Sequence, residues 1–253
     1  KIQFDYEKYH QLQFTVIATD RGTPARSSTV DVNIEIQDQN DNIPKFVQST
    51  YTFGIYEEVS PGTEVGRVYA TDADDKPNNK FAYKIHGAGG ISFRIDPETG
   101  VIYTNSFLDR EQTSSYHFEV EAQEEQHDRE KSVASVDIIV ADANDNYPVI
   151  SYPNKTNHTV NIHSNTQVGR DIVHIVATDA DAEQNGELSY WIIQGNDGGY
   201  FIIDSATSNL QLIKSLPADD RTFYILIRVA DGGNPSKTSL AELEVVVTEP
   251  PQN

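Results

Sequence analysis

Apolar and polar residues alternate along many short segments of the chain. Residues 30–36 (VDVNIEI) and 118–122 (FEVEA) place an apolar side chain at every second position, and 243–247 (LEVVV) begins in the same way. This alternation is typical of strands with one buried and one solvated face. Turn residues separate these segments, and none has the amphipathic-helix period of about 3.6 residues. The pattern predicts an all-β chain of antiparallel β-sandwiches.

The sequence also repeats itself. The segment 38–44 (DQNDNIP) returns at 142–148 (DANDNYP), 104 residues later, and 70–74 (ATDAD) returns at 177–181, 107 residues later. The repeat is therefore about 105 residues long, a common domain size. We expect residues 44–147 and 148–253 to be complete repeats, the second with an atypical C-terminal end. Residues 1–43 lack the ATDAD motif, so we expect them to be the C-terminal part of an earlier repeat.

Composition and charge narrow the class of function. The 253 residues carry 19 basic and 39 acidic side chains, a net charge of −20. Such a surface repels nucleic acid phosphates and anionic lipids, so we expect neither nucleic acid as a partner nor direct membrane contact. The lack of Cys excludes disulfides, thiolate metal sites and a Cys nucleophile, and no apolar run is long enough to span a membrane. The lack of Met leads us to expect an internal piece of a longer protein.

The repeated linkers are rich in oxygen ligands. Residues 142–146 (DANDN) hold two carboxylates and two amides, although these are also ordinary turn residues. Further acids recur with each linker, namely the pairs Asp109/Glu111 and Asp179/Asp181. Carboxylates gathered in this way favour a bound dication such as Ca²⁺, which takes about six to eight oxygens and therefore needs several segments.

Two other uses of these acids fit less well. Counted from Asp179, an EF-hand loop needs Gly and Glu where this chain has Gln184 and Tyr190, and the loop counted from Asp72 fails in the same way. Paired carboxylates could also be the acid/base pair of a glycosidase. Catalytic acids occur once, in a cleft, whereas these pairs recur in each repeat, so we expect no enzymatic activity.

Taken in order, the motifs resemble the extracellular cadherin repeat. They are Glu57, 70–74 (ATDAD), 95–100 (IDPETG), 108–111 (LDRE) and 142–146 (DANDN), and the resemblance covers essentially the whole chain. It implies tandem seven-stranded Greek-key β-sandwiches joined end to end, with about three Ca²⁺ ions at each complete junction. It also implies a calcium-dependent cell-adhesion segment in the ectodomain of a single-pass plasma-membrane protein. Its partners would be neighbouring repeats of the same chain, and cadherins in cis or trans.

The resemblance further implies which residues bind Ca²⁺. At the junction between residues 44–147 and 148–253 these are Glu57, Asp109, Glu111, Asp142, Ala143 (carbonyl), Asn144, Asp145, Asn146 (carbonyl), Asp179, Asp181, Asn185 (carbonyl) and Asp231. At the preceding junction they are Asp5, Glu7, Asp38, Gln39 (carbonyl), Asn40, Asp41, Asn42 (carbonyl), Asp72, Asp74, Asn78 and Glu124. With about three ions at each, the net charge of −20 would fall to about −8, and a jointed chain would become a stiff one.

Departures from the cadherin pattern carry further expectations. Tyr6 stands where Arg110 stands in the next repeat, although the flanking acids are kept. Glu124 stands where Asp231 does, and its longer side chain would weaken the third ion of the first junction. The last repeat lacks a Glu matching Glu57 and an acidic linker at its end, so we expect a calcium-poor, bent or flexible junction after residue 253.

Two features outside the acidic motifs bear on function. N-glycosylation sequons at Asn154 and Asn157 predict exposed glycans, which would be crowded if both were present. Trp191 is far from an N-terminal strand end, where classical cadherins carry an adhesive Trp. This favours a spacer segment that transmits force; an adhesive or receptor segment that binds a protein partner directly is the alternative.

Overall fold

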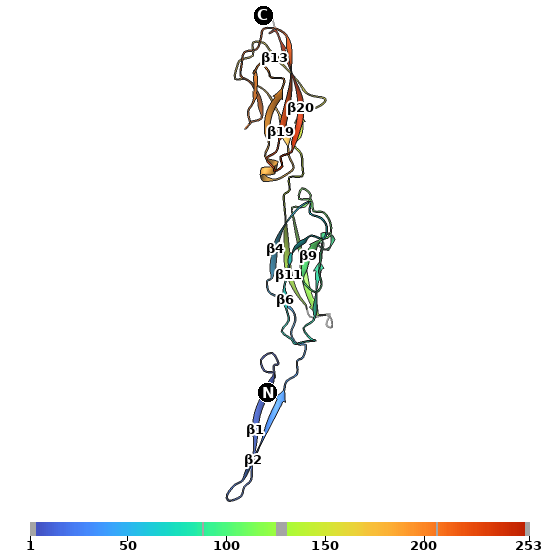
Figure 1. Cartoon of the computed structure of the whole chain (residues 1–253), viewed down its shortest axis with the longest axis vertical. Helices are drawn as coiled ribbons and strands as arrows, with labels where there is room; N and C mark the ends of the chain where they lie inside the picture. Colours follow the sequence, from blue (N-terminus) through green and yellow to red (C-terminus); the bar gives the residue numbers. More distant parts are fainter. Residues whose placement is uncertain (1–3, 88, 125–130, 206, 251–253) are drawn as a thin grey trace. The chain divides into compact units, whose positions relative to one another are not determined.

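Strands make up almost all of the regular structure (Figure 1), so the all-β prediction is confirmed. The computed structural model describes residues 4–87, 89–124, 131–205 and 207–250. The chain divides into two compact units, Lys1–Asp109 with Thr113–Val140, and Arg110–Gln112 with Ala141–Asn253.

Helical structure within the described ranges is limited to α1 (Gly89–Ser92) and the 3-10 turn η1 (Glu183–Gly186). The sequence pattern did not predict these turns, because a single turn has no period to detect. Neither has the length and apolar character needed to cross a membrane.

The first unit begins with an antiparallel hairpin of β1 (Gln11–Thr19) and β2 (Ser27–Glu35). The register pairs Val16 with Val30, and Phe14 lies two residues before Val16, so these apolar side chains share one face. Phe14 is 47% exposed and Val30 is 60% exposed. The hairpin thus has the alternation of a half-buried strand pair while its apolar face remains open to solvent.

The rest of the first unit is a sandwich of two sheets. The larger sheet has the order β4 (Thr50–Tyr56), β11 (Lys131–Ala141), β10 (Ser115–Glu124), β7 (Phe81–His86). The smaller has the order β5 (Glu64–Arg67), β9 (Val101–Thr104), β8 (Phe93–Ile95), and a short ladder joins β3 (Lys45–Phe46) to β6 (Ala70–Thr71). Seven strands appear as nine segments, because β3 and β4 pair with different neighbours, as do β5 and β6.

The second unit repeats this arrangement. Its larger sheet has the order β13 (Thr159–His163), β20 (Thr238–Thr248), β19 (Arg221–Ala230), β16 (Ser189–Gln194). The smaller has the order β14 (Asp171–His174), β18 (Asn209–Leu212), β17 (Phe201–Ile203), and β12 (Val149–Tyr152) pairs with β15 (Val176–Thr178). Strand β13 runs parallel to β20, whereas the other described pairs in this unit are antiparallel.

Each sandwich encloses its own apolar core. On β11, Ile138 is fully buried while its neighbour Ile139 is 54% exposed, as period-two alternation requires. Phe93 and Phe118, from opposite sheets, stack with ring centroids 5.6 Å apart. In the second unit Leu243, from β20, occupies a separate core formed in the same way. These packed sheets are the rigid support from which the acidic residues project.

Candidate metal centres

The linker 38–42 meets two acidic clusters in the first unit. Glu7, Asp41 and Asp74 each offer a carboxylate oxygen, and these atoms lie within 4.8 Å of one another. Asp72, Asp74 and Glu124 form a second cluster with the same limit. Asp72 directly follows β6 and Glu124 ends β10, so the β3–β6 ladder and the larger sheet bring them to this place. Asp74, only 3% exposed, belongs to both clusters.

Amide groups hold the linker against these acids. The Asn42 side-chain Nδ2 donates to Asp74 (2.7 Å) and Glu7 (3.1 Å). Asn40 Nδ2 donates to Glu124 Oε2 (2.9 Å), and Asn78 Nδ2 donates to Asp38 Oδ2 (2.9 Å). Predicted ligands from distant parts of the sequence are thus brought into direct contact.

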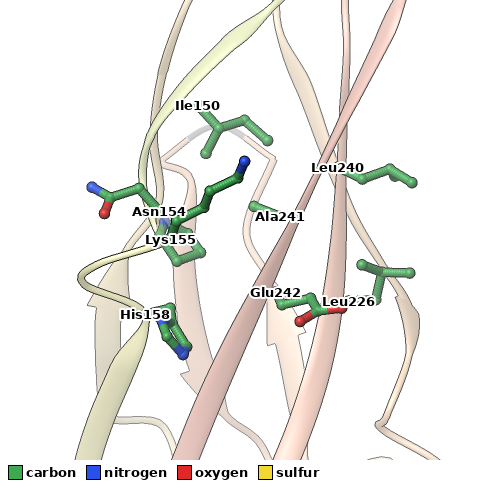
Figure 2. Close-up of a pocket in the computed structure, with 9 residues that line it drawn as sticks. Ile150, Asn154, Lys155, His158, Leu226, Leu240, Ala241 and Glu242 are labelled. Atoms are coloured by element: carbon green, nitrogen blue, oxygen red, sulfur yellow. The ribbon is translucent and has the colours of Figure 1, made fainter.

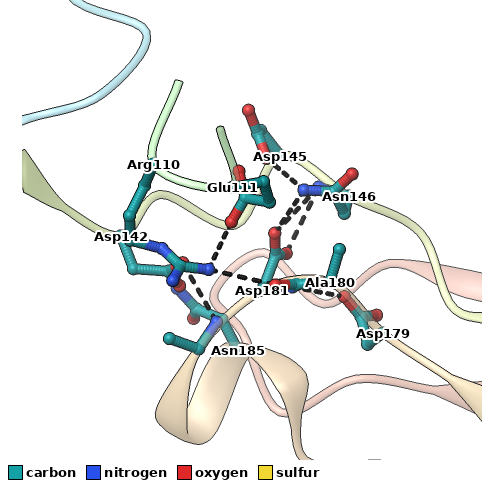
Figure 3. Close-up of polar contacts among 10 residues, drawn as sticks. Arg110, Glu111, Asp142, Asp145, Asn146, Asp179, Ala180, Asp181 and Asn185 are labelled. Carbon is teal, nitrogen blue, oxygen red and sulfur yellow. Dashed lines mark hydrogen bonds and ion pairs between the residues drawn. The ribbon is translucent and has the colours of Figure 1, made fainter. Parts of the chain in front are cut away.

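The second unit builds a matching pair of clusters on the linker 142–146 (Figure 3). Glu111, Asp142 and Asp181 form one, and Asp179, Asp181 and Asp231 form the other, again with ligand atoms within 4.8 Å. Asp179 directly follows β15 and Asp231 directly follows β19. Asp181 is shared, as Asp74 is in the first unit, and is 7% exposed.

Hydrogen bonds repeat as well. The Asn146 backbone N–H lies 3.2 Å from each carboxylate oxygen of Asp181, and Asn146 Nδ2 donates to the same group at 2.7 Å. Asn185 Nδ2 donates to Asp142 Oδ2 at 2.8 Å, as Asn78 does to Asp38. The resemblance implied only a carbonyl role for Asn185, so this side-chain contact is an addition to the expected arrangement.

Several oxygens in the clusters and on the linkers are buried without a hydrogen-bond partner. They are Asp38 Oδ1, Asp72 Oδ2, Asn144 Oδ1 and Asp179 Oδ2. Buried polar atoms normally have partners, and an unpartnered one calls for an explanation. Carboxylate and amide oxygens are the ligands that Ca²⁺ prefers, so the donor set at both linkers fits this ion.

The electrostatics of the clusters agree with this fit. Burial raises the pKa of Asp72, and the charges of Asp74 and Glu124 raise it further. Burial likewise raises the pKa of Asp179, with added repulsion from Asp181 and Asp231. A nearby dication would oppose both effects by favouring the charged carboxylates.

The remaining predicted ligands have less defined roles. Glu57 follows β4 and is 2% exposed, and Asp109 precedes the turn at Arg110–Gln112. Gln39, Ala143 and Asp145 lie within the two linkers. The side chain of Asp5 pairs with Lys8 Nζ at 2.5 Å, and this hydrogen bond is the main cause of its lowered pKa.

Sequence reasoning assigned no role to Arg110, which the structure places inside a cluster. Its Nε donates to Asp142 Oδ1 at 2.5 Å, and its guanidinium also contacts the Glu111 carboxylate and the Ala180 carbonyl oxygen (3.0 Å) (Figure 3). The side chain is 18% exposed. The one signal for it in the sequence is its replacement by Tyr6 in the equivalent motif of the first repeat.

The predicted glycosylation sites lie between β12 and β13. Asn154 and Asn157 are both exposed and form an isolated backbone bridge. Asn154 also borders an open pocket of about 740 Å³, which Leu240, Ala241 and Glu242 of β20 help to line (Figure 2).

Comparison with known proteins identifies the fold and the relatives. The model of the cadherin domain matches residues 51–141 and 158–248. Human protocadherin Fat 1 is 37% identical over 248 residues, which cover 97% of this chain but 5% of that protein. Human cadherin EGF LAG seven-pass G-type receptor 3 is 33% identical over 254 residues, covering 96% of this chain and 8% of the receptor. The chain therefore spans less than a tenth of these relatives.

The solved structures agree. The protocadherin gammaB7 EC3-6 cis-dimer structure is similar with a TM-score of 0.87 and 29% identity, covering 96% of this chain and 60% of that one. The tandem sandwiches expected from the sequence are thus the fold of cadherin repeats. Because the same domain model matches both sandwiches and most of the length, this chain belongs to the cadherin family.

Proposed function

We propose that the chain is a calcium-dependent cell-adhesion segment of an extracellular ectodomain. Ca²⁺ bound by the linkers 38–42 and 142–146 would fix each linker to the strand ends that carry its ligands. The residue ranges 1–43, 44–147 and 148–253 would be a partial repeat and two complete ones. Membership of the cadherin family and the similar relatives support this role over an enzymatic one.

One observation carries the calcium assignment. At both linkers, buried side-chain oxygens lack hydrogen-bond partners beside clusters of three carboxylates. Without a cation, these carboxylates repel one another and destabilise the linker; with Ca²⁺, the same charges become ligands. Calcium would therefore act mainly by ordering and stiffening the linkers, as the repeated acids of the sequence suggest.

The test compares the chain in millimolar calcium and in excess chelator. We expect a higher melting temperature in calcium, because an ion that binds only the folded protein stabilises it. Small-angle scattering on the same samples should show a narrower distribution of dimensions in calcium. No change in either signal would contradict calcium binding, while a change in melting temperature alone would keep the sites and remove the stiffening.

Direct contact with another cadherin is the second candidate. The similar protocadherin gammaB7 structure is described as a cis dimer, which favours lateral pairing of related repeats. Sedimentation of the purified chain in calcium tests this, and a monomer at high concentration would argue for a spacer. We also propose a single membrane span for the full protein, although one relative is named as a seven-pass receptor; labelling of the segments between candidate spans on intact cells would decide, because only a multi-pass protein exposes further loops outside.

The sequons and the next junction complete the proposal. We propose N-linked glycans at Asn154 and Asn157, which are exposed as such sites must be. Secretion from mammalian cells, followed by mass measurement of Asn154→Gln and Asn157→Gln, would count them. The calcium-poor junction after residue 253 stays a prediction, to be tested by calcium titration of a longer chain.

A further inference from the structure

The acid cluster of the second unit already contains a cation from its own chain. We propose that Arg110 is an internal counter-cation that competes with Ca²⁺ for Glu111 and Asp142, and so sets the calcium affinity of the linker 142–146. This inference rests on the proposed calcium sites. Arg110 would lower the calcium affinity of the site, whereas the carboxylates around it would bind the ion.

The Arg110 side chain is held in place by contacts with several segments of the second unit. Its guanidinium reaches three acceptors on three segments: Nε to Asp142 Oδ1 at 2.5 Å, the Glu111 carboxylate, and the Ala180 carbonyl oxygen at 3.0 Å. The side chain is 18% exposed and the Asp142 side chain 14%, so water screens their attraction only in part. Figure 3 shows the guanidinium lying between the linker and the loop that follows β15.

The two cations would use the same oxygens. Glu111, Asp142 and Asp181 present ligand atoms within 4.8 Å of one another, and Arg110 engages two of these three residues. The other donors to Asp142 are neutral: the Ala182 backbone N–H at 3.0 Å and Asn185 Nδ2 at 2.8 Å. Since a carboxylate oxygen directly bound to a dication is poorly available to a guanidinium, and since like charges repel, calcium binding weakens the arginine contacts.

The first junction provides an internal comparison. Its equivalent residue, Tyr6, is uncharged and donates its hydroxyl to Asp75 Oδ2 at 2.8 Å. The nearby Glu7 and Asp74 accept from the neutral Asn42 amide instead. The cation at the first junction is Lys8, which pairs with Asp5 and is 70% exposed, so calcium there displaces no buried cation from Glu7. The two junctions differ in this largely buried cation, which predicts different calcium affinities and a calcium-free linker 142–146 held more firmly than 38–42.

The experiment is a residue-resolved calcium titration of the full chain by NMR, with a competing chelator. The backbone amide of Asn146 reports on the second junction and that of Asn42 on the first, because they donate to Asp181 and Asp74 respectively. Removing a unit charge a few Å from a dication corresponds to about a tenfold change in affinity. In Arg110→Gln, the Asn146 amide should thus report calcium binding about tenfold tighter than in the wild type, and the Asn42 amide should report unchanged binding. The variant should also melt at a lower temperature than the wild type in chelator.

Two further variants make the result specific. Arg170→Gln removes the same charge from an exposed position just before β14 and should change neither signal. Arg110→Lys keeps the charge but loses the planar fork, so its affinity gain should be smaller than that of Arg110→Gln. Unchanged or weaker calcium binding by Arg110→Gln at Asn146 would overturn the inference. Absence of any calcium response in the wild type would instead overturn the proposed function on which it rests.

Discussion

Asp181 is the residue whose replacement tests the calcium assignment most sharply. It belongs to both acidic clusters of the second unit, is 7% exposed, and accepts hydrogen bonds from the Asn146 backbone and side chain. Asp181→Asn keeps the shape and one acceptor oxygen but removes the charge. A structural aspartate and a calcium ligand respond differently to this change, because only the ligand role depends on the ion.

The expected loss follows from binding linkage. If calcium is present at about 1,000 times its dissociation constant, it stabilises the fold by about 4.1 kcal/mol. Loss of a shared carboxylate ligand that weakens binding about 100-fold would reduce this to about 1.4 kcal/mol. In calcium, Asp181→Asn should therefore lower the free energy of unfolding by about 2.7 kcal/mol.

In chelator the same substitution should have little effect. Relief of repulsion with Asp179 and Asp231 is offset by the weaker hydrogen bonds that a neutral amide offers Asn146, so we expect a change below about 1 kcal/mol. Urea unfolding in both conditions measures the difference, and Glu242→Gln on the exposed face of β20 is the control for charge alone. Equal destabilisation with and without calcium would refute the argument and leave Asp181 a structural hydrogen-bond acceptor.

Three further predictions concern the core, a turn and pH. Ile138→Ala should lower the free energy of unfolding by about 3 kcal/mol, measured by urea unfolding, because Ile138 is fully buried. Ile139→Ala should lower it by less than about 1 kcal/mol, because Ile139 is 54% exposed. Similar losses for the two variants would mean that β11 is out of register. Gly195→Ala should prevent stable folding of the second unit, since φ is +82° and the added Cβ would lie 1.7 Å from the Tyr224 carbonyl oxygen. Gly199→Ala, with φ of +63° and open space, should cost only about 1 kcal/mol, and equal melting temperatures for the two variants would contradict this. In chelator, burial and neighbouring charges raise the pKa of Asp179 above its usual 3.8, so the folded state binds this proton more tightly than the unfolded chain. The contribution of Asp179 to stability therefore falls as pH rises from below 3.8 through the folded-state pKa. Asp179→Asn should gain stability relative to the wild type over this rise in pH, and a stability difference that does not change with pH would refute the cause.

The sequence by itself determined the strands and the repeated acids. Alternation at Phe118, Glu119 and Val120 predicts which face of the strand is buried, because the side-chain period of a strand is two, and the structure buries Phe118 and Val120 while Glu119 is exposed. The two copies of ATDAD and of the Asn-Asp linker predicted that Asp74 and Asp181 have equivalent places, and both are buried members of two clusters. These properties depend on neighbours in the sequence, which a repeat displays directly.

Tertiary structure alone decided how strands divide and which side chains meet. The split of β3 from β4 depends on pairing with β6 and β11, and no local pattern encodes that choice of partner. The contact of Arg110 with Asp142 and Ala180, and that of Asn185 with Asp142, join segments far apart in the chain. Burial of an oxygen such as Asp179 Oδ2 likewise depends on everything packed around it. Alternation and motifs report local preference, whereas distances between remote side chains arise only when the sheets pack.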